Sequence, residues 1–178
     1  MSELIEHDII DDGKLNMGSI NHSRAQGKLI VSLAQDGRLE VMPGLSIDLK
    51  GLDISQFGLK STVELKPDIS VYWQTPVPEA EPLDDIIRSP SPPDLAIEII
   101  STSQTLTEMI NKVKAYFALD VKSCWLVLPS LSTIYVFSPP HRYRVFPPDT
   151  ELVDETMDIH LPIQTVFKSS SETIRKVD

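Results

Sequence analysis

The stretch PPDLAIEIISTS, residues 92–103, constrains the fold more than any other part of the sequence. Five of the six residues from Leu95 to Ile100 are apolar, which is typical of a strand buried on both faces. The exception is Glu98, and an ionised carboxylate in such a strand costs several kcal/mol unless something compensates its desolvation. Either Glu98 points to water, or a partner inside the protein meets it.

The residues after this strand predict a crossover helix. In the segment 101–121, serine or threonine near 101–105 is a suitable N-cap. Its apolar residues recur at offsets of three and four and form one stripe: Leu106, Met109, Ile110, Val113 and Phe117. The segments SCWLVLP and STIYVFSP then indicate two strands joined by a turn at 129–132. Strands before and after a crossover helix predict an α/β (α+β) domain with a mixed β-sheet flanked by helices.

The N-terminal half adds a helix and further strands. Residues 11–19 indicate a turn and a short strand. We expect a helix over 21–37, capped by Asn21 or Ser23 and stopped by Gly37, with Ala25, Leu29 and Leu33 on its buried face. Two further segments, RLEVMPGLSIDL and KPDISVYW, read as strands, the first broken at Pro43-Gly44. Near the end, RYRVFP indicates another strand, and DIHLPIQTVF a strand followed by a short helix.

The chain length fits one domain over residues 1–178. Residues 74–93 contain six prolines and several acids, so we expect a long exposed loop there. The tail 169–178 is expected to fray.

Charge and composition limit the partners. The net charge of −10 repels polyanions and argues against strong nonspecific DNA binding, although it leaves room for a local site. No window approaches the roughly 18 apolar residues of a membrane span, and the acidic start lacks the features of an export signal. Cys124 is the only cysteine, which suits a reducing cytoplasm.

Glu98 gains a candidate partner when side-chain alternation is considered. Glu98 shares its strand face with Ala96 and Ile100, which are small or apolar. Asp68 stands where the earlier strand begins. If the two strands are neighbours, both carboxylates can share one cation, and such an all-oxygen site suits Mg²⁺ or Mn²⁺. The ion would offset the cost of burying Glu98.

The following helix supplies more polar candidates. Glu108, Lys112 and Tyr116 are spaced by four and form one row beside the apolar stripe. A lysine close to metal-bound carboxylates can position a water molecule and stabilise negative charge on a phosphoryl group.

The ordered set Pro67-Asp68, Glu98-x-Ile100, STSQ, Lys112-x-x-x-Tyr116 and CWLVLP resembles the Uma family of "putative restriction endonucleases" in the PD-(D/E)xK nuclease-like superfamily. The resemblance covers residues 12–167 and implies a restriction-endonuclease-like core and a Mg²⁺-dependent or Mn²⁺-dependent endonuclease acting on DNA.

The resemblance also implies roles for individual residues. Asp68 and Glu98 would bind the metal together with the backbone carbonyl of Ile99. The superfamily's usual lysine position is Ile100 here, and Lys112 would replace that lysine from the helix. His22, Glu108 and Tyr116 would support the site.

Less specific interpretations stay open for each residue. Pro-Asp is an ordinary strand entry, Glu108 and Lys112 are spaced as a surface ion pair, and His22 can bond the backbone at a helix start. A non-catalytic interaction module that keeps the fold is the main alternative function, and a metal-dependent hydrolase of small phosphoesters is a third. A homodimer would bring two centres to the two strands of a duplex.

Overall fold

The computed structural model describes residues 19–76, 85–139 and 142–168. The turn and strand expected before Ser19 and the frayed tail expected at 169–178 lie outside these residues. None of the helices in the described ranges is long and apolar enough to span a membrane.

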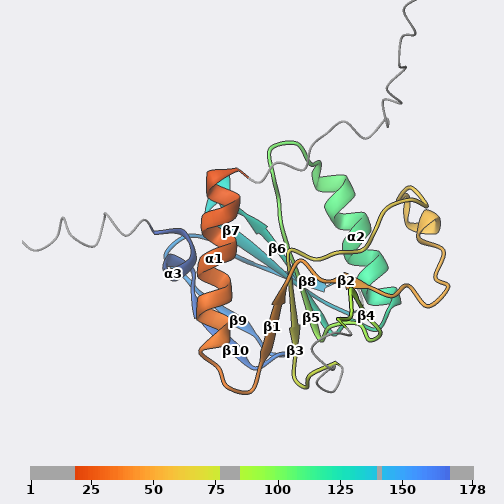
Figure 1. Ribbon diagram of the computed structural model, residues 1–178. Helices are drawn as coiled ribbons and strands as arrows, with labels where there is room; N and C mark the ends of the chain where they lie inside the picture. Colours follow the sequence, from red (N-terminus) through yellow and green to blue (C-terminus); the bar gives the residue numbers. More distant parts are fainter. Residues whose placement is uncertain (1–18, 77–84, 140–141, 169–178) are drawn as a thin grey trace, which may run out of the picture.

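A six-stranded mixed sheet forms the centre of the molecule, with strands in the order β1-β3-β5-β6-β7-β8 (Figure 1). The strands are β1 (Glu40–Pro43), β3 (Ile69–Tyr72), β5 (Leu95–Ile99), β6 (Ser123–Leu128), β7 (Thr133–Ser138) and β8 (Arg142–Phe146). Within this sheet only β5 and β6 run parallel, and all other neighbours are antiparallel. The parallel pair requires the crossover helix α2 (Leu106–Ala118), as the sequence predicted.

Helices cover both faces of this sheet (Figure 1). Helix α1 (Ile20–Ala34) packs on one face together with α3 (Ile163–Phe167), and α2 packs on the other. The alternation in β5 decides which residue meets which layer: Leu95, Ile97 and Ile99 belong to the α1 core, whereas Ala96 belongs to the α2 core. Glu98 therefore faces α2.

Helix α1 buries Ala25, Leu29 and Leu33, as expected, and ends at Ala34. The expected cap is wrong, because neither Asn21 nor Ser23 caps the helix. Ser19 is the N-cap, and its hydroxyl accepts the amide of His22 at 3.1 Å. The apolar periodicity does not locate the cap, because Ser19, Asn21 and Ser23 all lie before Ala25, the first buried residue.

Helix α2 begins with a capping box. Thr105 is the N-cap and accepts the amide of Glu108, whose carboxylate in turn accepts the amide of Thr105. The buried residues of the helix are Met109, Val113, Ala115 and Tyr116. Of the three residues spaced by four along this helix, Tyr116 is therefore buried and Glu108 is exposed at the helix start.

Smaller elements complete the fold. Within the proline-rich segment 74–93, β4 (Arg88–Ser89) pairs in parallel with β2 (Ser46–Ile47), so that segment is not loop throughout, and residues 77–84 lie outside the described residues. Short 3-10 turns are η1 (Ile54–Phe57) and η2 (Pro129–Leu131). A hairpin of β9 (Glu151–Asp154) and β10 (Ile159–Pro162) covers the α1 face, and β9 was not predicted.

Candidate active site

The sheet register brings Asp68 and Glu98 together. Strands β3 and β5 are antiparallel neighbours, as the cation hypothesis requires, and Ile69 pairs with Ile97. Asp68, one residue before β3, therefore lies across from Glu98 near the C-terminal end of β5. Both α1 and α2 also begin at this end of the molecule (Figure 1).

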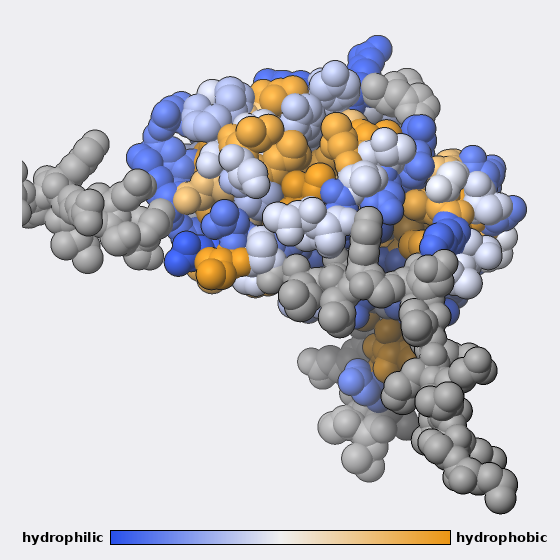
Figure 2. Space-filling view, turned by 90° about the horizontal axis from the view of Figure 1, so that it is seen from above, coloured by the Kyte–Doolittle hydropathy of each residue, from blue (hydrophilic) through white to orange (hydrophobic). Residues whose placement is uncertain are grey.

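The surface at this end is partly apolar. Figure 2 looks down on it and shows hydrophobic surface toward the middle, with hydrophilic residues around it. The first residues of the two helices, Ile20 and Leu106, are 70% and 54% exposed. Apolar side chains therefore lie at the same end of the molecule as the candidate site.

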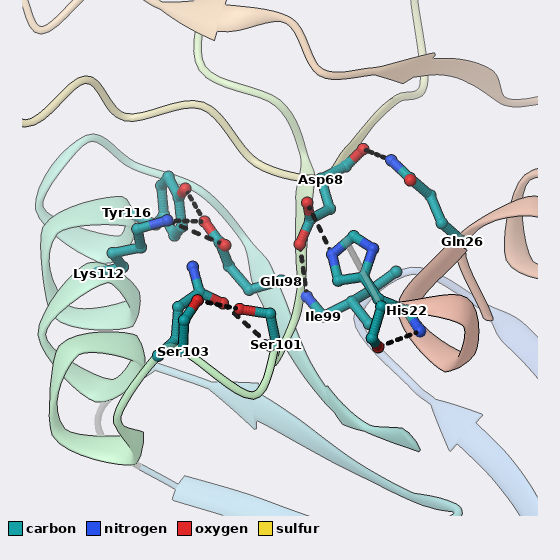
Figure 3. A network of polar contacts seen from close by, with 11 residues as sticks. His22, Gln26, Asp68, Glu98, Ile99, Ser101, Ser103, Lys112 and Tyr116 are labelled. Carbon is teal, nitrogen blue, oxygen red and sulfur yellow. Dashed lines mark hydrogen bonds and ion pairs between the residues drawn. The ribbon is translucent and has the colours of Figure 1, made fainter. Parts of the chain in front are cut away.

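Asp68 is held through its side chain and its main chain (Figure 3). Its Oδ2 accepts the amide of Ile99 at 2.7 Å, and His22 Nε2 lies 3.3 Å from Oδ1. Its carbonyl oxygen accepts Nε2 of Gln26 at 2.9 Å and the amide of Gly44 at 3.1 Å. The carboxylate is thus fixed at the end of β5.

Glu98 is buried, with 2% of its surface exposed, and has two partners on α2. Lys112 Nζ lies 3.1 Å from Oε2 and 3.2 Å from Oε1. The hydroxyl of Tyr116 donates to Oε1 (Figure 3). The question raised by the apolar strand is answered: Glu98 does not point to water, because a lysine and a tyrosine meet it inside the protein.

Electrostatics couple these groups. Burial raises the pKa of the Glu98 carboxyl, the ammonium of Lys112 acts in the opposite direction, and the charge of Asp68 raises it again. Burial also raises the pKa of the Tyr116 hydroxyl well above its usual range, so Tyr116 is a neutral donor. The hydrogen bond with Asp68 raises the pKa of His22, against the effect of its partial burial.

The structure gathers most of the residues proposed from the sequence. Asp68 contacts His22, Glu98 contacts Lys112 and Tyr116, and these two groups adjoin at the end of β5 and interact through their charges (Figure 3). Glu108 differs, because its Oε2 accepts the amide and hydroxyl of Thr105 at the start of α2. Its role as a helix cap follows from position, since an acid at the third residue of a helix closes a capping box.

Sequence reasoning missed Gln26. Its side chain contacts a main-chain carbonyl 42 residues away, and such a contact leaves no periodic pattern. The available signal was its spacing of four from His22, which places both side chains on one face of α1.

The carboxylate oxygens of Asp68 and Glu98 are donors of the kind that a hard cation binds. Across the described residues, no group of three or more His, Cys, Asp or Glu side chains is arranged to hold a metal ion. Asp68 and Glu98 contribute two carboxylates at this end of the sheet. Mg²⁺ commonly uses one or two carboxylates and completes its shell with water and substrate phosphate. The Ile99 amide points to Asp68, and in an extended residue the carbonyl points to the same side. An ion at Glu98 would replace contacts that Lys112 and Tyr116 make.

Comparison with known proteins identifies the family and the fold. The sequence matches the family model of the Uma2 family, described as "Putative restriction endonuclease", over residues 5–164. The chain belongs to this family. A crystal structure of a "putative nuclease belonging to DUF820" from Anabaena variabilis superposes with a TM-score of 0.68 at 23% identity, covering 85% of this chain and 82% of that one. No curated protein matches the sequence.

The resemblance to the Uma family and the restriction-endonuclease-like fold are thus confirmed. Family and fold together support a nuclease role. The assignment of individual residues to catalysis or metal binding stays a prediction.

Proposed function

We propose that the protein is a metal-dependent endonuclease that hydrolyses phosphodiester bonds in DNA. The observation that carries the proposal is the meeting of Asp68, Glu98 and Lys112, which come from the start of β3, the end of β5 and the second turn of α2. Two carboxylates and a lysine on rigid elements are suited to phosphoryl chemistry.

Each residue has a distinct role in this proposal. Asp68, Glu98 and the carbonyl of Ile99 would hold Mg²⁺ or Mn²⁺, which when bound supplies an activated water and a polarised phosphate. Lys112 would turn its ammonium from Glu98 toward the phosphate and stabilise the charge that develops there. His22 orients the Asp68 carboxylate, and Tyr116 orients that of Glu98.

A cleavage assay tests the proposal. Supercoiled plasmid, single-stranded DNA and a branched duplex are incubated with the protein and Mg²⁺ or Mn²⁺, and nicked and linear products are counted separately. We expect Asp68→Asn, Glu98→Gln and Lys112→Met each to lose about 100-fold or more of the activity, as loss of a charge-stabilising group does. Glu64→Gln, a change in an acid that pairs with Arg88 on the surface, is the matched control and should cleave like the wild type.

Circular dichroism and an unfolding curve for each variant separate lost chemistry from lost folding. Absence of metal-dependent cleavage by the folded wild type on all three substrates contradicts the proposal. So does unchanged cleavage by the folded Asp68 and Glu98 variants.

One observation favours the alternative of a non-catalytic module. Both oxygens of Glu98 already have partners in Lys112 and Tyr116, so the site is closed as an ion pair. Calorimetric titration with Mn²⁺ distinguishes the two functions. Binding that disappears in Glu98→Gln favours the nuclease, whereas no binding at millimolar Mn²⁺ favours the module. A homodimer and a cytoplasmic location remain predictions of the sequence.

A further inference from the structure

Strand β8 is an edge of the central sheet. It pairs with β7 along its whole length, and no described strand pairs with its other side. Four of its five residues, Arg142 to Val145, are exposed. The other edge, β1, ends in Pro43, which has no amide to donate to a further strand. Strand β8 therefore offers an open row of main-chain donors and acceptors.

The two faces of β8 differ in chemistry. Tyr143 and Val145 point to one face and are 59% and 44% exposed. The Tyr143 ring lies 5.5 Å from that of Phe137 and 6.0 Å from that of Tyr135, measured between centroids. This face is an aromatic platform that continues from β7.

The opposite face of β8 is basic. Arg142 and Arg144 share it with the buried Phe146 and line a cavity of about 560 Å³ that lies between β8 and β9. Arg144 Nη1 lies 3.0 Å from Glu155 Oε1, and its guanidinium stacks over Phe146 at 5.2 Å. Both arginines are therefore on one side of the open edge, in a chain whose net charge is −10.

The open edge, the aromatic face and the basic face of β8 together suit one kind of ligand. We propose that β8 binds an extended acidic peptide segment of a partner protein as an added strand. The main chain of the peptide would pair with the open edge, its carboxylates would reach Arg142 and Arg144, and its apolar residues would lie against Tyr143 and Val145. Because β6 and β7 separate β8 from β5, this surface is distinct from the candidate active site and does not depend on the proposed function.

A second copy of the chain and nucleic acid fit β8 less well than an acidic peptide. A second copy that paired its own β8 antiparallel across a two-fold axis at Arg144 or Tyr143 would place arginine opposite arginine, which is unfavourable. Nucleic acid would satisfy the arginines, but it has no peptide main chain to pair with the strand edge. An acidic peptide strand can pair with the edge, bring carboxylates to the arginines and lay apolar side chains against Tyr143 and Val145.

Peptide binding tests the proposal directly. The probe is a fluorescent, end-blocked ten-residue peptide that alternates glutamate with valine, and binding is followed by anisotropy on the full chain. One control peptide replaces glutamate with lysine. A second carries N-methyl groups on alternate amides and keeps every charge. We expect the acidic peptide to bind at least about tenfold more tightly than either control, and to protect the amides of 142–146 from hydrogen exchange.

Variants locate the surface. The double variant Arg142→Gln/Arg144→Gln should lose about tenfold in affinity for the acidic peptide, and both changes are at exposed positions. The matched control Arg38→Gln/Arg88→Gln alters two other exposed arginines that also form ion pairs and should bind like the wild type. Equal affinity for the acidic and N-methylated peptides, unprotected β8 amides, or an oligothymidylate that binds more tightly through the same arginines would overturn the proposal.

Discussion

Glu98 takes its chemistry from two neighbours on α2. The carboxylate lies on a buried strand, yet Lys112 supplies a charge and Tyr116 a hydrogen bond. A buried ion pair of this kind is costly to break from one side, because the remaining charge stays in the protein interior. The Glu98–Lys112 pair is therefore an element of stability as well as part of the proposed active site.

The energetic coupling of this pair can be measured. We expect Lys112→Met to lower the free energy of unfolding by about 3 kcal/mol, because it leaves the Glu98 carboxylate buried without its ammonium. The double variant Glu98→Gln/Lys112→Met should lose less than the sum of the two single changes, because no unpaired charge remains and glutamine still accepts from Tyr116. Urea unfolding measures all four proteins, with the exposed Lys114→Met as the control on the same helix. Strictly additive losses would show that the pair is not coupled.

His22 predicts a pH dependence of stability. Its hydrogen bond with Asp68 raises its pKa in the folded protein, so the folded state holds the proton more tightly than the unfolded state. The resulting stabilisation is complete below the unfolded pKa of about 6.5 and is lost as the pH rises through the higher folded pKa. The difference in unfolding free energy between wild type and His22→Gln should therefore shrink from pH 5.5 to pH 8.5. His160→Gln, at an exposed histidine, is the control, and a difference that grows with pH contradicts the assignment.

At the scale of elements, α1 anchors the start of β3. Gln26 and His22, one turn apart, contact the carbonyl and the carboxylate of Asp68. Gln26→Leu should lower the unfolding free energy by only about 1 kcal/mol, because the amide of Gly44 still reaches that carbonyl. If the proposed metal site exists, Mn²⁺ affinity should fall as well. Arg24→Leu, an exposed change on the same helix, should alter neither the unfolding free energy nor the Mn²⁺ affinity. An unchanged Mn²⁺ affinity in Gln26→Leu would assign Gln26 a purely structural role.

The capping box of α2 is a second element with a clear cost. Thr105→Ala removes the acceptor of the Glu108 amide and should lower the unfolding free energy by about 1 kcal/mol. Thr107→Ala lies two residues later, inside the helix and exposed, and should change it by less than about half as much. Thermal unfolding of both variants is sufficient, and equal effects would show that the cap contributes nothing beyond helix propensity.

At the scale of the whole molecule, Asp154 joins the β9–β10 hairpin to the central sheet. The carboxylate is 2% exposed, and its Oδ2 accepts Ser123 Oγ at 2.6 Å and Trp125 Nε1 at 2.7 Å. Its Oδ1 accepts the amides of Thr156 and Met157. The donors of Ser123 and Trp125 connect β9 to β6. The two amides hold the turn between β9 and β10.

Loss of this connection should be among the larger effects of a single substitution. Asp154→Asn presents an amide where the indole N–H of Trp125 needs an acceptor, and we expect a loss of about 3 kcal/mol. Trp125→Phe should lower the unfolding free energy less in the Asp154→Asn variant than in the wild type. In that variant the indole N–H has already lost its acceptor. Chemical denaturation of the wild type, the two single variants and the double variant gives their coupling energy, with the exposed Asp158→Asn as control. Additive losses would contradict the coupling of Asp154 with Trp125.

Much of the fold was predictable because it is written in local patterns. The stripe of Ala25, Leu29 and Leu33 predicted α1, and the alternation around Glu98 predicted which residues face each layer. Most of the polar residues proposed for the site also come together, and Glu108, which caps α2, is the exception. Strand β9 was missed, because two of its four residues are acids, and one of them, Asp154, is buried by partners that sequence does not reveal.

The sequence by itself determined most of the helices and strands and the face on which Glu98 lies, because side-chain periodicity depends only on neighbours along the chain. The tertiary structure decided what Glu98 and Asp68 touch. The Asp68–Ile99 bond spans 31 residues and the Gln26–Asp68 bond spans 42. Such contacts depend on sheet register and on helix packing over the whole domain, and neither leaves a repeating signal in the chain.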